Sequence, residues 1–487
     1  MRQSTTRPHQ SEAGQVALEA LEPRVLLSHT SGLDHALYMP EGFSAPTAVE
    51  VVELAYADDT GSADWQLFAH YERGGAGDAI VRIAEGTLNA GQTDSVAVWG
   101  DGASLVRADE PYSLVLRSST DDVTALLRHS DFGARTAQHF IDASDDGASD
   151  DGFVIPGLRR DEDASRDFIV FHNPGDNAAT VRLELEDSSG RTYVYQQSVQ
   201  GERRGGWNLQ QMPNLPEGVY TARVTSDAMI VLAGSRYALE RDTATIDLPG
   251  RSTAAAGAIL SAEFDGGSST ADNTTIFIAN PSDQAVQVRF RTIERDDGPV
   301  SGPAMFTVMV DANDAASVSL RAQGFTSDDD DFSIVYQADA PVSISAVTER
   351  RGNLIFTQPE TRGSDTWFFD QGLIDRLRGD ELRTEDVFLF NPTASSQNVT
   401  ITFTFADGTR LVETKSLDPL EVEDVDGRIE DLIGLPTGGL AFTISVQSTG
   451  PLVAMLEHWD PVGRATEATS HGVPTGTVAD LVDIAVF

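Results

Sequence analysis

The sequence predicts an all-β protein with four tandem immunoglobulin-like antiparallel β-sandwich domains behind a short N-terminal helical or disordered leader. An apolar run that ends in Asn-Pro recurs three times, at Asn173-Pro174, Asn280-Pro281 and Asn391-Pro392. The asparagines are 107 and 111 residues apart, about the length of one such sandwich. Short runs with period-two alternation fill each interval, whereas helical periodicity is weak.

The segment after each Asn-Pro predicts a half-buried strand followed by a tight turn. The alternating apolar positions are Val181, Leu183 and Leu185 in the first copy, Val286, Val288 and Phe290 in the second, and Val399, Ile401 and Phe403 in the third. A glycine lies 17 or 18 residues beyond each asparagine, at Gly190, Gly298 and Gly408, where a hairpin needs positive φ. We expect the Asn-Pro itself to be structural, since Asn accepts bonds from backbone amides past a strand end and Pro cannot continue a ladder. A binding role is the alternative.

Two more strands, separated by a short polar turn, are expected late in each copy. They cover residues 219–224 and 229–232, then 332–336 and 341–347, then 440–446 and 451–456. A fourth, divergent copy lies upstream, with residues 65–70 in place of the Asn-Pro strand, 80–83 next, and 112–116 with 123–127 as the late pair. Residues 371–378 are the best candidate for a short helix.

The modules are expected to follow one another as a semi-rigid string. The predicted ranges are 1–40 for the leader, 41–148, 149–252, 253–362 and 363–474 for the sandwiches, and 475–487 for a C-terminal strand or export tail. The boundaries fall in small, acidic or glycine-rich runs at 142–152, 248–257 and 359–365. Because these joints are short, long flexible tethers are not expected.

The charge balance is strongly acidic. The chain has 487 residues, 76 Asp and Glu, 34 Lys and Arg, and a formal net charge of −42. Such a field repels phosphates, so nucleic acid is not expected as a partner, and it suits a hydrated surface in salty water. There are no cysteines, which excludes disulfides and thiolate metal sites.

A motif stands near the N-terminus, where residues 21–28 read LEPRVLLS. Its defining residues are Leu21, Glu22, Pro23, Arg24, Leu26 and Leu27. The segment resembles the LEPRxLL-type segment at the start of many large, repeat-containing surface and exported proteins of Gram-negative bacteria. The resemblance covers about the first 30 residues and implies an extracellular or cell-surface location, without naming an activity. A disordered start with a short helix before Pro23 is the plainer interpretation.

The rest of the chain adds little about targeting. No apolar run is as long as a membrane span, and the first residues lack the apolar core of a Sec signal. The chain ends in Asp483 and four apolar residues, which is similar to the C-terminal signals of type I secretion substrates. A last strand of the fourth sandwich explains residues 478–487 equally well.

Motifs for catalysis are missing. The sequence has no G-x-S-x-G, H-E-x-x-H, Walker or G-x-G-x-x-G motif, so we expect no enzymatic activity and name no catalytic residue. Calcium is the one cofactor considered. Asp142, Ser144 and Asp146 match the opening of a calcium loop, but Phe153 stands where an EF-hand has Glu. Asp328 and Asp330 lie in a second acidic run; solvated turns are the alternative for both clusters.

These observations together favour a non-catalytic secreted or surface protein with a structural or adhesive role. The expected partners are an extracellular protein or polysaccharide, and the export machinery through the leader or tail. A carbohydrate-binding array is one alternative, with Trp99, Trp207, Trp367 and Trp459 as candidate platforms. A secreted hydrolase with a deep acidic cleft is the other.

Overall fold

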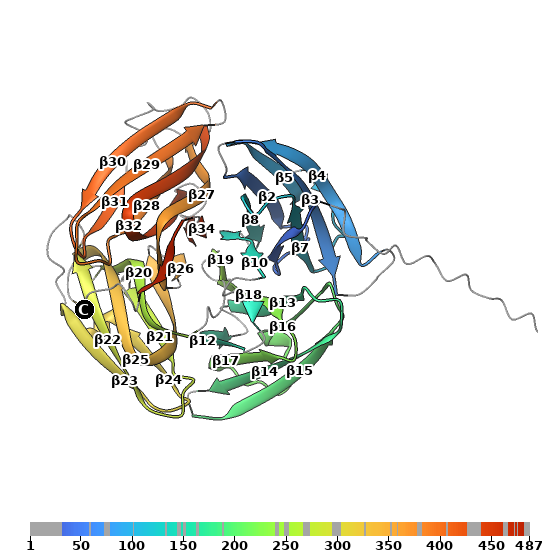
Figure 1. The fold of residues 1–487 in the computed structure, drawn as a ribbon. Helices are drawn as coiled ribbons and strands as arrows, with labels where there is room; N and C mark the ends of the chain where they lie inside the picture. The colour runs from blue at the N-terminus through green and yellow to red at the C-terminus, as the bar shows by residue number, and fades with distance from the viewer. Residues whose placement is uncertain are drawn as a thin grey trace, which may run out of the picture.

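The chain folds into antiparallel β-sheets that form four lobes around a common centre, as the computed structural model shows (Figure 1). The structure describes residues 32–57, 60–72, 78–100, 102–131, 134–143, 148–149, 152–161, 165–187, 189–238, 243–247, 253–265, 273–294, 303–325, 328–350, 353–357, 359–376, 382–405, 408–425, 440–460, 466–471, 473–474 and 476–481. The all-β, antiparallel prediction is confirmed. By strand pairing we call β1–β10 lobe 1, β11–β19 lobe 2, β20–β26 lobe 3 and β27–β35 lobe 4.

Lobe 2 shows the plan most clearly. Its elements are β11 Ala148–Ser149, β12 Phe153–Arg160, β13 Ser165–Asn173, β14 Ala179–Asp187, β15 Thr192–Val199, β16 Arg203–Asn208, the 3-10 helix η1 Leu209–Gln211, β17 Gly218–Ser226, β18 Ile230–Ala238 and β19 Thr243–Asp247. The outer sheet has the order β12-β17-β14-β15, and the inner sheet pairs β16, β13, β18 and β19. On β14, Val181, Leu183 and Leu185 are fully buried between the sheets while Glu184 and Glu186 face outward. This alternation leaves the outward face of β14 partly exposed.

Lobe 1 repeats the same order. Its strands are β1 His35–Met39, β2 Val49–Tyr56, β3 Ser62–Tyr71, β4 Ile80–Asn89, β5 Thr93–Gly100, β6 Ala103–Ser104, β7 Tyr112–Ser118, β8 Val123–Asp131, β9 Ala134–His139 and β10 Ile141–Asp142. The sheets run β1-β7-β3-β4 and β5-β2-β8-β9, so β2 matches the Asn-Pro strand β13 and β3 matches β14. The expected places of residues 65–70 and 80–83 are therefore wrong by one strand, while the late pair, β7 and β8, matches β17 and β18 as expected. The end of β2 carries no Asn-Pro, so the motif that marks the matching strand in the other copies is missing here.

Lobes 3 and 4 join their two sheets through one long strand. Lobe 3 has β20 Ala254–Asp265, β21 Asn273–Ala279, β22 Val286–Glu294, β23 Met305–Val310, β24 Ala315–Ser319, the 3-10 helix η2 Leu320–Gln323, β25 Asp328–Arg350 and β26 Asn353–Thr357. β25 pairs first with β22 and then with β21. The expected late pair of strands is thus continuous here, because the backbone stays extended through Ala338-Asp339-Ala340 as it crosses from one sheet to the other.

Lobe 4 uses the same device. Its strands are β27 Arg362–Arg376, β28 Leu382–Phe390, β29 Gln397–Phe405, β30 Arg410–Leu417, β31 Val422–Val425, β32 Leu440–Asp460, β33 Thr466–His471, β34 Val473–Pro474 and β35 Val478–Asp480. β32 pairs with β29 and then with β28. The helix expected at residues 371–378 is wrong over its described part, since residues 371–376 belong to β27 and pair with β32 and β28.

The Asn-Pro corners tie each lobe together. Asn280 is buried, its Nδ2 donates to the main-chain oxygens of Gln284, Val310 and Asp311 at 2.7, 3.2 and 2.9 Å, and its Oδ1 accepts from Ser282 N at 3.0 Å. Asn173 and Asn391 repeat all four bonds. The side chain thus takes the acceptor role expected from the sequence, and adds three donor bonds that the sequence did not reveal.

In lobe 1 a tyrosine occupies the corner. Tyr56 pairs with Val123 at the end of β2, where Asn173 ends β13. Its hydroxyl donates to Thr60 O, four residues on, at 3.1 Å. Asn173 Nδ2 likewise reaches Asn177 O, four residues on, at 2.7 Å. The corner contact is therefore kept with a different donor.

The lobes form a closed ring, which corrects the expected string. The inner strands β9, β19, β26 and β33 contact one another in cyclic order, and β27 of lobe 4 also touches β2 and β8 of lobe 1 (Figure 1). The outer sheet of one lobe packs on the inner sheet of the next, so each interface joins unlike surfaces. A head-to-tail interface of this kind makes a ring when its rotation closes. The short segments between the lobes are compatible with this packing. The ring could not be predicted, because contacts between lobes join residues far apart in the sequence and leave no local pattern.

The described ends of the chain also refine the predicted ranges. β1 lies inside the range expected as leader, yet it pairs with β7 and belongs to lobe 1. At the other end β35 pairs with β27, as a C-terminal strand would. The LEPRVLLS segment and residues 482–487 lie outside the described residues.

Candidate functional site

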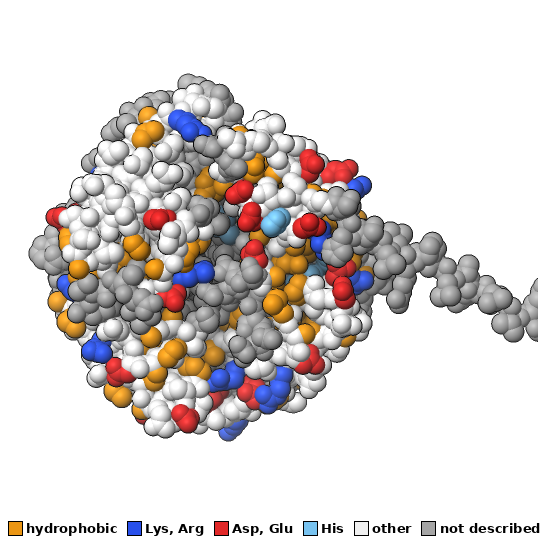
Figure 2. All heavy atoms as spheres, in the orientation of Figure 1, with side chains coloured by type: hydrophobic (Ala, Val, Ile, Leu, Met, Phe, Trp, Pro, Cys, Tyr) orange, Lys and Arg blue, Asp and Glu red, His pale blue; other side chains and the backbone are white. Residues whose placement is uncertain are grey.

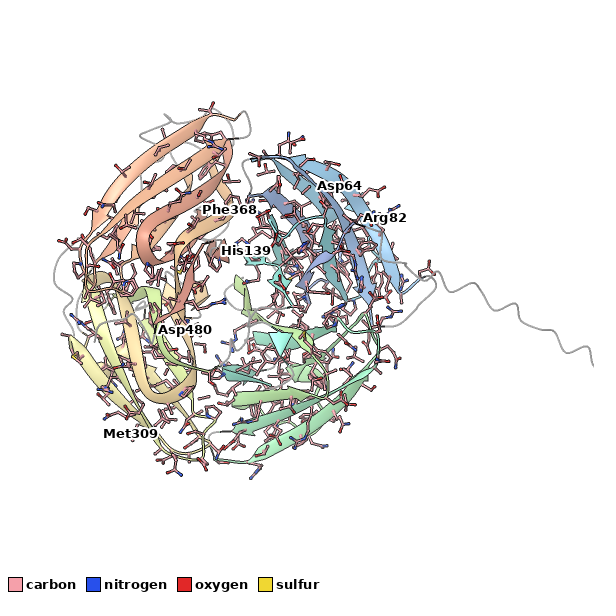
Figure 3. All side chains as sticks on the ribbon, in the orientation of Figure 1. Asp64, Arg82, His139, Met309, Phe368 and Asp480 are labelled. Atoms are coloured by element: carbon pink, nitrogen blue, oxygen red, sulfur yellow. The ribbon has the colours of Figure 1, made fainter. Side chains whose placement is uncertain are left out.

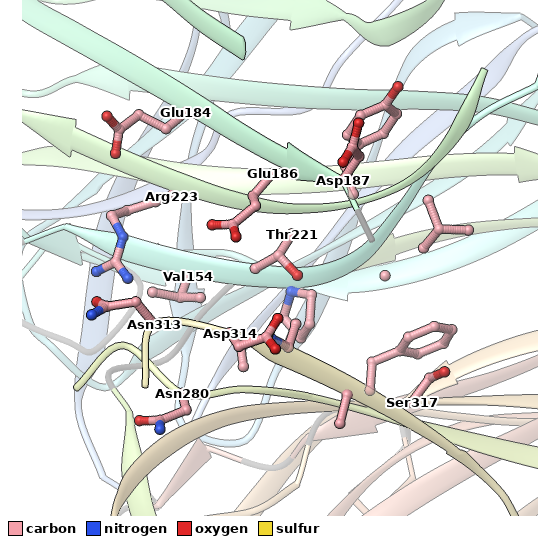
Figure 4. Close-up of a pocket in the computed structure, with 18 of the residues that line it drawn as sticks. Val154, Glu184, Glu186, Asp187, Thr221, Arg223, Asn280, Asn313, Asp314 and Ser317 are labelled. Carbon is pink, nitrogen blue, oxygen red and sulfur yellow. The ribbon is translucent and has the colours of Figure 1, made fainter. Parts of the chain in front are cut away.

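A cleft of about 380 Å³ opens between lobes 2 and 3 (Figure 4). Lobe 2 contributes the outward faces of β12, β14 and β17, and lobe 3 contributes β21, β24 and the turn before β24. Its polar lining is Glu184, Glu186, Asp187, Thr192, Thr221, Arg223, Asn280, Asn313, Asp314 and Ser317. A volume of this size falls in the range of small-ligand pockets, about 300–1,000 Å³.

The floor of the cleft depends on a glycine. Gly157 has φ +81°, and a Cβ at this position would lie 2.8 Å from Cγ of Phe277. Only glycine therefore lets β12 of lobe 2 approach the Phe277 ring of lobe 3. Nearby, Ser343 Oγ donates to Val154 O at 2.7 Å, which ties the two lobes below the opening.

The Asn280 corner positions the lobe 3 side of the cleft. Its bonds to Val310 O and Asp311 O hold the turn between β23 and β24. Asn280 N donates to Asp314 O at 2.9 Å, and Asn313, at φ +54°, donates its N–H to Ser282 O at 2.8 Å. The turn therefore presents Asp314 toward β14, where Figure 4 shows Glu186 and Thr221.

Two of the four acids are occupied by neighbours. Glu184 pairs with Arg182. Asp187 accepts from Ser189 N, Ser189 Oγ and Arg191 N at 2.9, 2.6 and 3.1 Å, and these bonds, that of the Ser189 hydroxyl first, lower its pKa. Both contacts lie within lobe 2, so they shape its rim rather than bridge the cleft.

Glu186 and Asp314 carry the electrostatics of the cleft. Partial burial, followed by the charge of Asp314, raises the pKa of Glu186, while Arg223 acts in the opposite direction. An acid beside a second acid favours a bound cation or a basic group, or holds a proton. This is the arrangement in the described structure that most resembles a binding site.

The predicted calcium residues do not come together in the described part of the chain. Asp142 is exposed at the end of β10, while Ser144 and Asp146 lie outside the described residues. Asp328 and Asp330 belong to β25 and pair with Asp265 and Phe264, so this run is strand rather than turn. Within the described residues there is no group of three metal-ligating side chains. Calcium stays a prediction.

The tryptophans are mostly structural. Trp367 is buried and its Nε1 donates to Leu452 O at 2.8 Å, so it cannot serve as an exposed platform. Trp99 packs against the lobe 1 core and donates to Ala45 O at 2.6 Å. Trp207 is half-buried against Phe171 and lines a shallow groove with Glu72, Gln196, Gln197 and Gln200. The side chain of Trp459 lies outside the description.

A buried polar network between lobes 1 and 2 was also missed from the sequence. His129 Nδ1 lies 2.8 Å from Glu50 Oε1, and its Nε2 lies 3.0 Å from Tyr237 Oη. Tyr237 Oη is also 3.0 Å from Glu41 Oε1, and Tyr112 donates to Glu50. The chain of bonds crosses from lobe 1 to lobe 2 at Tyr237.

The network occupies a position that recurs in every lobe. The strand pairing that joins Glu50 to His129 joins Asp167 to Arg236, Thr274 to Thr348, and Glu385 to His458. Each first residue lies six positions before its corner residue. That constant offset was the one signal in the sequence, and it becomes visible only once Tyr56 is recognised as a corner.

Comparisons with known proteins place the chain in no family. No protein-family model matches, and the curated proteins give no match. The chain is similar to the crystal structure of Thermotoga maritima 1070, with 26% identity over 24% of this chain and 98% of that one, at a TM-score of 0.20. It is also similar to a tetra-tandem repeat in the extending region of a large adhesion protein, with 12% identity over 87% and 92%, at 0.12. A third similarity, to native E. coli alpha-2-macroglobulin, has 10% identity over 88% and 28%, at 0.10.

Those TM-scores assign neither a fold family nor a function. Among the described residues, no helix is long and apolar enough to cross a membrane.

Proposed function

We propose that this chain is a non-catalytic secreted or cell-surface protein with a structural or adhesive role, built from four immunoglobulin-like sandwiches. The closed ring carries this proposal, because it holds the partly exposed edge strands of the four outer sheets, β4, β15, β23 and β30, at fixed positions on one compact body. Figure 3 places Arg82 and Met309 on its outer rim, and His139 near the centre. A rigid body of this kind loses little conformational entropy when several of its surfaces engage a partner.

The acidic surface supports a role outside the cell, and its negative charge favours basic partners over acidic ones. The net charge is −42, and Figure 2 shows acidic side chains gathered over lobe 1 on the face in view. Such a surface attracts basic partners and cations and repels anionic polymers. The LEPRxLL-type segment supports export, through the leader or the C-terminal tail.

The cleft between lobes 2 and 3 is the proposed docking place for a basic group of an extracellular protein partner. Glu186 and Asp314 supply negative charge from two lobes, and Arg223 limits the site to a group that leaves the guanidinium room. The charges of the cleft are set by the ring, since neither lobe contains both acids.

Fractionation of the native host tests the location. Full-length chain should appear outside the cytoplasm, and chain lacking residues 1–30 should stay inside. If both forms are cytoplasmic, the surface proposal fails.

Paired variants test the cleft. Glu186→Gln with Asp314→Asn should weaken capture of a basic polypeptide such as polylysine, measured by titration calorimetry. Glu217→Gln with Asp283→Asn removes the same charge from exposed sites on the same two lobes. Equal losses in both pairs would contradict a specific cleft. Polysaccharide turnover that Glu186→Gln abolishes would replace the binding proposal with a hydrolase.

The Trp207 groove supports carbohydrate binding as a second candidate. It has a volume of about 390 Å³ and combines one aromatic ring with three glutamines and Glu72, which are hydrogen-bonding groups suited to hydroxyls. Trp207→Ala should abolish retardation in polysaccharide affinity gels, while Trp99→Phe should leave it unchanged. Unchanged retardation in Trp207→Ala would remove this candidate.

A further inference from the structure

Two buried histidines meet at the interface between lobes 1 and 2. His70 comes from β3 of lobe 1 and His172 from β13 of lobe 2, and their ring centroids are 5.1 Å apart. Tyr38 of β1 also contacts the His172 ring, with centroids 5.2 Å apart. An apolar cluster of Tyr38, Phe68, Val115, Ile141 and Val231 surrounds the contact. We call this region the histidine seam.

His172 is built into the seam as a neutral group. Its side chain is fully buried, and neither ring nitrogen has a hydrogen-bond partner among the described residues. His70 has one partner, since its Nδ1–H donates to Glu202 O at 3.0 Å. A charged imidazolium in such a place would lack both water and a carboxylate.

The surrounding charges also disfavour protonation. The charges that act on the seam residues are those of Arg117 on β7, Arg203 on β16 and Asp142 on β10. Arg204, the next residue on β16, donates to Pro40 O instead. The carboxylate of Glu202, the residue whose main-chain oxygen accepts from His70, is paired with Arg117 at 3.2 Å. Glu41 and Glu72 act on Arg204. Burial, with smaller contributions from Arg203 and Arg117, lowers the pKa of His70 to about 3, and burial followed by the charge of His70 lowers the pKa of His172 well below its usual range.

The other three interfaces do not use imidazoles at this point. At these interfaces the outer-sheet residues that match His70 are Glu186, Ile293 and Thr404. The residues before the corner, which match His172, are Ala279, Phe390 and Ala55, in the same order. Glu186 and Ala279 both line the cleft, and Ile293 and Phe390 share one apolar cluster. Only the seam between lobes 1 and 2 gains positive charge here when the pH falls.

We propose that the histidine seam is an acid-sensitive gate, at which protonation of His70 and His172 opens the ring between lobes 1 and 2 while the other interfaces hold. Both histidines are neutral when the seam is closed and take up protons freely when it is open. His70 and His172 therefore favour the closed state above pH 6.5, the ordinary pKa of histidine, and lose that effect as the pH falls toward 3. Over this range the opening constant rises by up to about tenfold per histidine for each pH unit. His129 acts in the opposite direction at the same interface, since burial lowers its pKa but Glu50 outweighs burial and raises it.

Hydrogen exchange of the full chain, read by mass spectrometry at pH 7.5 and 4.5 with correction for intrinsic rates, tests the gate. Peptides from β3 and β13 should lose protection at pH 4.5, while peptides from β22 and β28, at the apolar interface, should keep it. The variant His70→Ile with His172→Phe copies Ile293 and Phe390 and should keep the seam protected at both pH values. His35→Gln, an exposed histidine on β1, should behave as wild type.

Equal protection of wild-type β3 and β13 at the two pH values would overturn the proposal, as would opening of the double variant by the same factor as wild type. If the double variant does not fold, His172→Phe alone should reduce the pH dependence by about half on a logarithmic scale. An unchanged pH dependence in that variant would equally contradict the gate. Loss of protection at all four interfaces together would indicate general acid unfolding instead.

Discussion

At the scale of single residues, the side chain of each corner asparagine makes four hydrogen bonds to the main chain. Asn173 is buried and bonds to three carbonyls from two separate turns. Its acceptor role could be predicted from Asn-Pro, because a local turn needs only neighbours in sequence. The bonds to Val199 and Gln200 could not, since they depend on a strand 26 residues away.

Truncating a corner should be costly. Asn173→Ala leaves three carbonyls and one amide without their partner, so we expect the free energy of unfolding to fall by about 2–3 kcal/mol. Asn177→Ala, in the same turn, removes an exposed side chain and keeps the carbonyl that Asn173 bonds. Urea unfolding compares the two. Equal losses of unfolding free energy in the two variants would contradict a stabilising role for the buried Asn173 amide.

His129 makes a different prediction from the seam histidines. Tyr237 has one hydroxyl proton and two partners at 3.0 Å, so it can donate to Glu41 only if His129 Nε2 is also protonated. Burial acts against that charge, but the hydrogen bond and charge of Glu50 outweigh it and raise the pKa of His129.

A raised pKa in the folded state gives stability that is fully present below pH 6.5 and is lost as the pH rises through the folded value. His129→Gln should therefore reduce the free energy of unfolding most at pH 5.5, and progressively less toward pH 9, measured by urea denaturation. A deficit that grows with pH would contradict a charged His129.

At the scale of elements, strands could be predicted well from the sequence where one face of the strand is apolar and the other is polar. The alternating positions of β14, β22 and β29 are buried as expected, because period-two patterns report local burial directly. The failures share a cause. The expected helix at residues 371–378 and the expected places of residues 65–70 and 80–83 are wrong because pairing with distant strands decides both. Glu186 and Asp314 were missed for the same reason, since their proximity depends on two lobes.

The approach of β12 to β21 gives an element-scale prediction. Gly157→Ala places a methyl group against the Phe277 ring and strains a backbone at φ +81°, so lobes 2 and 3 should separate more readily, with a loss of about 1–3 kcal/mol. Gly408→Ala has the same φ with open space around it and isolates the strain alone. Hydrogen exchange in β21 should rise only in Gly157→Ala. A rise in both variants would mean that the contact is not required.

At the scale of the whole molecule, one kind of interface is used four times with different chemistry. The histidine seam, the acidic cleft and the apolar contact of Ile293 with Phe390 occupy matching places around the ring. Repetition of the sandwich therefore supplied the frame, and divergence at a few interface positions supplied the features that could serve binding or regulation.

Closure of the ring underlies all of these features, and small-angle X-ray scattering at neutral pH tests it most directly. A compact chain of this length should give a radius of gyration of about 23 Å, with one symmetric peak in the distance distribution. A radius roughly twice as large, with a long tail in that distribution, would indicate a string of separate modules and contradict the account.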